Sequence, residues 1–339
     1  MTSPVVTVTL NPAIDRTVWL DHLVPGATNR SGDTFATIGG KGINVARHVA
    51  RLGHPALALG IAGEDQAAAI ERHLDSLGVT ARFLPTPGET RTNFKLIERT
   101  SGRLTEINGA GPIVARDLLD AFERELILAV ERHGARAVVL SGSLPRGVDG
   151  DVYARWIDVF HGRPEVRVIL DASDAGLAYG VAARPFLVKP NRVEAESIVG
   201  APIANDADAR AAATAIHRLG PRGVLLSLGS DGAVACWEGA CRTILPRSPD
   251  EPRSGRTTTV GAGDAMVARM AVGTAIADPA IDATAFFALC EAAVAEAERH
   301  IRSVAPTTPD ASGSTHPGER RAVTPPTGPQ LVEAPMSEP

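Results

Sequence analysis

Short apolar strands alternate with amphipathic helices through the middle of this 339-residue chain. The strands are apolar along their whole length, which is typical of strands that helices cover on both faces. This alternation favours a mostly parallel sheet, in which ligands bind beyond the carboxyl ends of the strands. Strands are predicted at 137–140, 166–171, 186–188 and 223–228, and helices at 116–133, 150–160 and 207–219.

Two other parts of the chain have a different character. The stretches 12–37 and 90–108 lack a helical period and contain the polar–apolar mixtures typical of strands. Residues 305–339 hold eight of the 25 prolines and few large apolar residues, a composition that predicts a disordered tail. We therefore expect one domain over residues 1–304, followed by this tail.

Composition excludes several classes of function. The formal net charge is −5, and no basic stripe indicates a nucleic-acid partner. No apolar run is long enough for a membrane span, and the apolar run 5–10 is too short for a signal peptide. Three cysteines, Cys236, Cys241 and Cys290, show no metal-binding or paired spacing. We expect them to be free thiols in a reducing cytoplasm.

The segment Gly261-Ala262-Gly263-Asp264 precedes residues that suit a helix. Small residues let backbone N–H groups approach a ligand, and a helix N-terminus favours phosphate. Asp264 would lie in the first turn, where a carboxylate can accept a proton from an attacking hydroxyl. The alternative is a tight turn followed by a capping aspartate.

A second glycine-rich segment, Gly39-Gly40-Lys41-Gly42-Ile43-Asn44, opens a predicted amphipathic helix that ends near Leu52. Its backbone can close on a polyhydroxy substrate, and Lys41 can neutralise a phosphate. A tight loop with a solvent-facing lysine is the alternative. The segment is not a Walker loop, because Gly42 follows Lys41 where that motif needs Ser or Thr.

Lysine is scarce in this chain. Only three of the 34 basic residues are lysines, namely Lys41, Lys95 and Lys189. A compact ammonium and a planar guanidinium are not interchangeable at a tight site, so the retained lysines are candidates for function. Chance retention is the alternative.

Other polar residues also follow predicted strands. Asp15 could accept hydrogen bonds from sugar hydroxyls, or be an ordinary turn aspartate. Asn191 and Glu194 could position Mg²⁺ directly or through water, or be a helix cap and a surface carboxylate. Arg91 and Asn93 could reach a substrate phosphate or hydroxyl, or be ordinary strand residues.

A further loop, residues 227–232, follows the predicted strand 223–228. It could contact a phosphate, or simply form a hairpin turn before a strand at 233–237.

Taken as an ordered set, these segments resemble the PfkB carbohydrate kinases of the ribokinase-like superfamily, within it the 1-phosphofructokinase and tagatose-6-phosphate kinase branch. The resemblance covers roughly residues 5–275 and implies an αβα sandwich with a mostly parallel central sheet and a small β-sheet lid from about 12–37 and 90–108. It also implies ATP and Mg²⁺ as co-substrates. The matching segments are 9–15, 39–44, 141–145, 189–191 with Glu194, 227–229 and 260–264.

By position, the resemblance implies a role for each matching residue. Asp264 would be the catalytic base, with the anion hole formed by Gly261, Ala262 and Gly263. Magnesium would be held by Asn191 and Glu194, through water. The sugar phosphate would be contacted by Asp15, Gly39, Gly40, Lys41, Asn44, Arg91, Asn93 and Ser141. The nucleotide side would be lined by Lys189, Asn191, Ser227, Gly229 and Gly232.

The expected activity is ATP-dependent phosphorylation of a ketohexose phosphate, foremost fructose 1-phosphate to fructose 1,6-bisphosphate. Fructose 6-phosphate and tagatose 6-phosphate are alternative substrates. An alternative of another class is a catalytically impaired, sugar-phosphate-binding regulatory protein, which only the unusual C-terminal third favours. The resemblance further implies a homodimer formed through the lid.

Overall fold

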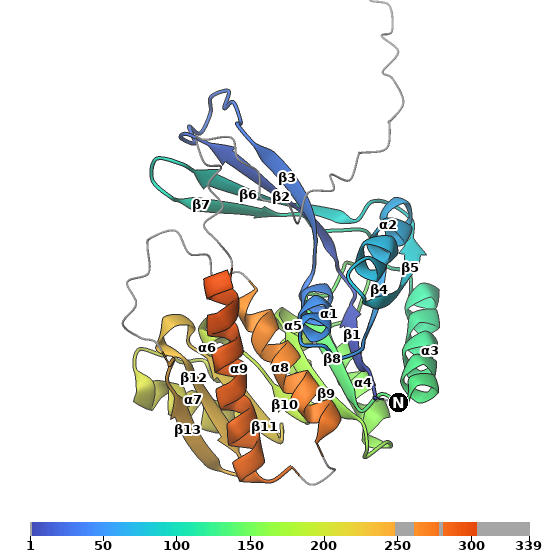
Figure 1. Cartoon of the computed structure of the whole chain (residues 1–339), viewed down its shortest axis with the longest axis vertical. Helices are drawn as coiled ribbons and strands as arrows, with labels where there is room; N and C mark the ends of the chain where they lie inside the picture. The colour runs from blue at the N-terminus through green and yellow to red at the C-terminus, as the bar shows by residue number, and fades with distance from the viewer. Residues whose placement is uncertain (1, 248–260, 278–280, 304–339) are drawn as a thin grey trace, which may run out of the picture. The chain divides into compact units, whose positions relative to one another are not determined.

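The computed structural model describes residues 2–247, 261–277 and 281–303. Within these ranges, the larger sheet has nine strands, parallel except at the β11–β12–β13 end (Figure 1). In spatial order the strands are β13 (Ala240–Ile244), β12 (Ala233–Trp237), β11 (Gly223–Ser227), β10 (Leu187–Val188), β9 (Arg167–Ala172), β8 (Ala137–Gly142), β1 (Val5–Thr9), β4 (Ala56–Gly63) and β5 (Thr80–Thr86).

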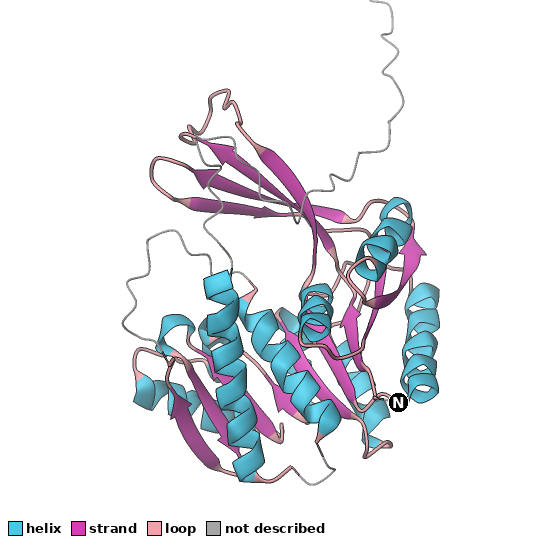
Figure 2. Ribbon diagram, viewed as in Figure 1, coloured by secondary structure: helices cyan, strands magenta, loops and turns pink. Residues whose placement is uncertain are grey.

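Helices cover both faces of this sheet (Figure 2). Successive strand residues point to opposite faces, so Val5 belongs to one apolar core while Val6 belongs to the other. The Val5 core is closed by α1 (Lys41–Arg51), α2 (Glu64–Asp75), α8 (Ala262–Ile276) and α9 (Ala283–Ser303). The Val6 core is closed by α3 (Arg116–His133), α4 (Val152–His161), α5 (Asp174–Ala182), α6 (Arg192–Val199) and α7 (Asp206–Arg218). The predicted αβα sandwich is confirmed.

A smaller four-stranded sheet is formed by the two stretches that lacked a helical period. Its order is β3 (Thr34–Gly39), β2 (Ala13–Leu20), β6 (Arg91–Glu98) and β7 (Leu104–Asn108), with β2 and β6 parallel. We call this sheet the lid. Its strands confirm the predicted second sheet, although β3 continues two residues beyond the expected boundary.

Some elements differ from expectation. The helix α5 was not predicted, because its two glycines are poor helix formers. Tertiary packing overrides that propensity, since a Cβ on Gly180 would lie 2.6 Å from Leu170 and one on Gly176 would lie 3.2 Å from Tyr153. The strands β5 and β13 were also missed. The tail 305–339 lies outside the described residues, so its predicted disorder stays a prediction.

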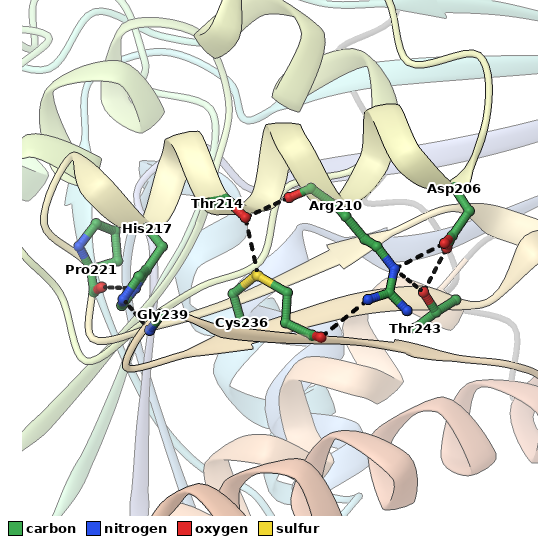
Figure 3. The surroundings of a disulfide bond; sticks show 9 residues. Asp206, Arg210, Thr214, His217, Pro221, Cys236, Gly239 and Thr243 are labelled. Atoms are coloured by element: carbon green, nitrogen blue, oxygen red, sulfur yellow. Dashed lines mark hydrogen bonds and ion pairs between the residues drawn. A yellow bond between two sulfur atoms is a disulfide. The ribbon is translucent and has the colours of Figure 1, made fainter.

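The expectation of free thiols is wrong for two of the three cysteines. Cys236 and Cys241 form a disulfide, while Cys290 is free and buried. The two bonded residues lie directly opposite each other in the β12–β13 hairpin, a register that a spacing of five residues does not reveal. Figure 3 shows Thr214 of α7 beside the disulfide, its hydroxyl 3.3 Å from the Cys241 sulfur.

Within the part of the chain that the structure describes, no helix combines the length and apolar character needed to cross a bilayer.

Candidate active site

Charged side chains gather at the carboxyl edge of the larger sheet. Asp171 lies in β9 near its carboxyl end, Lys189 directly follows β10, and Ser227 ends β11. Helices α1 and α8 begin at the same edge and bring Lys41 and Asp264 to this cluster. Parallel strands share one carboxyl edge, so residues far apart in sequence converge there.

Asp264 lies in the first turn of α8 and is 8% exposed. Its Oδ2 accepts a hydrogen bond of 2.9 Å from Nδ2 of Asn44. Burial, and then the negative charge of Asp171, raise the pKa of Asp264 to about 7, although Asn44, Lys41 and Lys189 act in the opposite direction. A carboxyl group with this pKa can accept a proton near neutral pH.

Asp171 is fully enclosed and links two lysines. Its Oδ1 lies 3.3 Å from Nζ of Lys41 and 3.2 Å from Nζ of Lys189. Burial acts to raise the pKa of Asp171, but the two ammonium groups hold it below its usual range. Burial likewise opposes the charge on Lys41, yet Asp171, Glu194 and Asp264 raise the pKa of Lys41 above its ordinary value. The Asp171 carboxylate and the Lys41 ammonium are therefore both charged at neutral pH.

Asn191 and Glu194 form a reciprocal cap at the start of α6. The Asn191 side chain accepts from the Glu194 backbone N–H, and the Glu194 carboxylate accepts from the Asn191 backbone N–H, both at 2.9 Å. The other Glu194 oxygen lies 3.5 Å from Nζ of Lys41. The capping alternative therefore describes Asn191, while Glu194 also belongs to the charged cluster.

The Gly261–Gly263 segment forms the N-terminus of α8. Gly261 caps the helix with a φ of 84°, a left-handed conformation that favours glycine. The N–H groups of the first turn have no partner within the helix, so they can serve an anion. Gly263 lies beside Lys189, since a Cβ there would be 3.4 Å from the lysine Nζ.

The lid contributes a second polar group. Asp15 accepts hydrogen bonds from Nδ2 of Asn93 at 2.9 Å and from Nζ of Lys95 at 3.1 Å. Gly39 of β3, which pairs with Ala13, gives room for this carboxylate, because a Cβ there would lie 2.6 Å from Asp15 Oδ2. Gly40 follows with a φ of 129° and leads into α1. The two predicted residues Asp15 and Asn93 are thus held together.

Arg91 and Ser141 have mainly structural surroundings. Arg91 donates to the backbone carbonyls of Asn11 and Pro12, at 3.0 and 3.3 Å, and burial lowers its pKa. Ser141 is the last but one residue of β8 and has no exposed surface, and its carbonyl accepts from the Tyr153 hydroxyl at 3.0 Å. Their roles toward substrate stay predictions.

The last residue of β11 and the loop that follows it contain the three remaining predicted residues. Ser227 donates to the Pro190 carbonyl at 3.3 Å. Gly229 faces open space with a φ of 65°, whereas a Cβ on Gly232 would collide with the Ile244 carbonyl at 2.2 Å. This close packing explains the glycine at position 232, and the roles of Ser227, Gly229 and Gly232 toward a nucleotide stay predictions.

Sequence reasoning missed two members of these clusters. Asp171 ended a predicted strand without being identified as a site residue, although its position at a carboxyl end was an available signal. Lys95 was noticed for its rarity but was not assigned to the substrate side. Both residues gain their importance from contacts with partners at least 18 positions away, namely Lys189, Lys41 and Asp15.

A buried carboxylate, two ammonium groups and a helix N-terminus thus share one end of a parallel sheet. This arrangement suits phosphoryl transfer, in which catalysis is mostly positioning and charge stabilisation.

Comparison with known proteins identifies the family. The model of the "pfkB family carbohydrate kinase" family matches residues 4–305. The 1-phosphofructokinase of Xanthomonas campestris pv. campestris is 38% identical over 275 residues, which cover 80% of this chain and 84% of that protein. The chain belongs to the pfkB family and is a carbohydrate kinase.

Solved structures support the same fold. A possible 1-phosphofructokinase from Thermotoga maritima matches with a TM-score of 0.76 and 26% identity, covering 90% of this chain and 94% of that one. Phosphofructokinase-2 from Escherichia coli in complex with potassium matches with a TM-score of 0.75 and 28% identity, covering 88% and 92%.

Proposed function

We propose that this kinase transfers the γ-phosphoryl group of ATP to fructose 1-phosphate, giving fructose 1,6-bisphosphate. The observation that carries the proposal is the buried Asp264, which has a pKa of about 7 and a hydrogen bond from Asn44. The name of the Xanthomonas relative supports the substrate, since the match extends over most of both chains.

In the proposed reaction, Asp264 is the general base. The sugar 6-hydroxyl oxygen attacks the γ-phosphorus, and Asp264 takes the hydroxyl proton. The bond to the bridging oxygen breaks, and ADP leaves with the electron pair. Loss of a positioned base costs on the order of 10²–10⁴ in rate.

The Gly261–Gly263 N–H groups would stabilise the transferring group, together with Lys41 and Lys189. The positions of the two lysines are fixed by Asp171, so their charges are aligned before the substrate binds. Such preorganised charge is usually the largest contribution to catalysis of this kind. Asp15, Asn93 and Lys95 would contact the sugar phosphate from the lid.

Magnesium is implied by the family, and the residues present fit it. Asp171 Oδ2 is buried without a hydrogen-bond partner within the described residues, and the carboxylates of Asp171 and Glu194 both contact the Lys41 ammonium. Mg²⁺ prefers oxygen ligands and keeps several waters, so Glu194 would hold it through water, with Asn191 fixing the carboxylate. When bound, the metal would neutralise charge on the nucleotide phosphates.

The test is an ADP-release assay with Mg²⁺ and ATP, offering fructose 1-phosphate, fructose 6-phosphate and tagatose 6-phosphate in parallel. We expect clear preference for fructose 1-phosphate. Preference for a 6-phosphate would replace the substrate assignment. No ADP with any sugar, from folded protein that binds fructose 1-phosphate in a calorimeter, would favour the regulatory alternative.

Homodimer formation through the lid is also part of the proposal, as is a cytoplasmic location. Phe94 and Ile107 are cross-strand neighbours on the lid, 38% and 55% exposed. They point away from the Asp15 face, because successive strand residues alternate. An Ile107→Lys variant that stays dimeric in light scattering would contradict a lid interface on this face.

A further inference from the structure

A cavity of about 220 Å³ lies at the opposite edge of the larger sheet from the proposed active site. Its walls come from α4 and from the connections that lead into β9, β10 and β11. These strands are parallel, so their amino ends share one edge, while their carboxyl ends carry the catalytic cluster. Along β9, Arg167 lies at the cavity and Asp171 at the cluster, roughly 13 Å apart by strand rise.

The lining of this cavity carries only positive charge. It contains Arg163, Arg167, Arg184, Arg222 and His161, and no acidic residue. The deepest of these, Arg167, is 8% exposed and donates to the Thr274 carbonyl of α8 at 2.9 Å.

Arg163 and Arg222 have acidic partners outside the lining. Arg163 pairs with Glu131, whose side chain is 49% exposed, and Arg222 lies 3.7 Å from Glu238, which is 62% exposed. Ion pairs with such exposed carboxylates contribute little free energy, so an incoming anion can compete for the guanidinium groups.

Arg184 is held over the cavity by an unusual backbone. Its φ of 58° is left-handed, and Nε2 of His161 lies 3.2 Å from its carbonyl oxygen. Gly220 packs against its side chain, since a Cβ there would lie 2.3 Å from Arg184 Cγ. Among the described residues, Arg184 forms no ion pair. Strained residues persist where their surroundings impose them, and at ligand sites such strain is common.

We propose that this cavity binds a small organic anion that carries one phosphate group, at a site separate from the kinase centre. Guanidinium groups match phosphate oxygens in a bidentate fork, and several are available here. The remaining walls are apolar, with Phe160 and Phe186 among them, and suit a short carbon skeleton. The volume is below the roughly 300–1,000 Å³ of pockets for larger ligands, so the ligand is small.

The test is isothermal titration calorimetry at low salt, with glycerol 3-phosphate and inorganic phosphate as probes. The variant is Arg184→Gln with Arg222→Gln, which removes two charges from exposed side chains and keeps their length. Arg124→Gln, an exposed arginine of α3 outside the cavity, is the matched control. Circular dichroism and thermal unfolding check that each variant is folded, and the two single variants replace the double one if it is not.

We expect wild type and control to bind glycerol 3-phosphate alike, and the double variant to lose at least tenfold in affinity for one binding event. Any event at the kinase centre stays unchanged. Identical isotherms for the variant and the wild type, or no binding by the wild type, would overturn the proposal.

Discussion

Asn44 and Asp264 are 220 positions apart in the chain, yet the Asn44 amide donates a 2.9 Å hydrogen bond to the Asp264 carboxylate. The bond joins the first turns of α1 and α8, each of which begins within one of the two glycine-rich segments. The segments therefore form one site, in which the first fixes the orientation and acidity of the carboxylate in the second.

Replacing Asp264 with Asn should lower kcat by on the order of 10²–10⁴, because the base is lost while the shape is kept. The same substitution should raise the free energy of unfolding at alkaline pH. The pKa of Asp264 is raised from 3.8 to about 7, so its stabilising contribution is present below about pH 4 and lost as the pH rises through about 7. At pH 8 the Asn variant should therefore unfold at a higher temperature than the wild type. Near-normal turnover would contradict the base assignment.

The pH dependence of kcat/KM should follow the same carboxyl group. Activity requires ionised Asp264, so kcat/KM should fall as the pH drops through about 7. An Asn44→Ala variant loses the hydrogen bond that lowers this pKa, and its acidic limb should move to higher pH. Steady-state rates from pH 5.5 to 9 measure both profiles. If kcat/KM of the wild type and of the variant falls at the same pH, Asn44 does not influence the pKa of Asp264.

Removing the buried charge of Asp171 should be costly. An Asp171→Asn variant leaves Lys41 and Lys189 without their shared carboxylate, and breaking a buried pair typically costs about 3–5 kcal/mol. Urea unfolding measures this change, and kcat/KM should fall with it because both ammonium groups lose their anchor. Asp149→Asn is the control, because the Asp149 side chain forms an exposed pair with Arg116 and its replacement should have little effect.

The disulfide should contribute modestly to stability. It closes a loop with a sequence separation of five, for which chain entropy gives about 2 kcal/mol. Reduction should lower the unfolding temperature by a few degrees and leave kcat unchanged, since the hairpin contributes no group to the proposed chemistry. Thiol titration of protein unfolded without reductant should find only Cys290 reactive. Three reactive thiols would show that the disulfide is absent and that all three cysteines are free.

Much of the fold could be predicted from local pattern. The helix expected at 116–133 has those boundaries, because one apolar face and a closing glycine define it. The helix α5 could not be predicted, because Gly176 and Gly180 serve close packing against Tyr153 and Leu170, which propensity does not record. The prediction of free cysteines failed for a related reason, since the pairing of Cys236 with Cys241 depends on the register of the hairpin.

For the candidate site, the glycine-rich segments, Lys41, Lys189 and Asp264 could be predicted from the sequence, because they occur in recognisable local motifs. Only tertiary structure decided which of them touch. It brought Asp171 between the two lysines, set Asn44 on Asp264 and gathered four arginines at the far edge of the sheet. The physical reason is that burial and charge proximity, which set acidity and strength of binding, depend on distances across the fold that no spacing along the chain specifies.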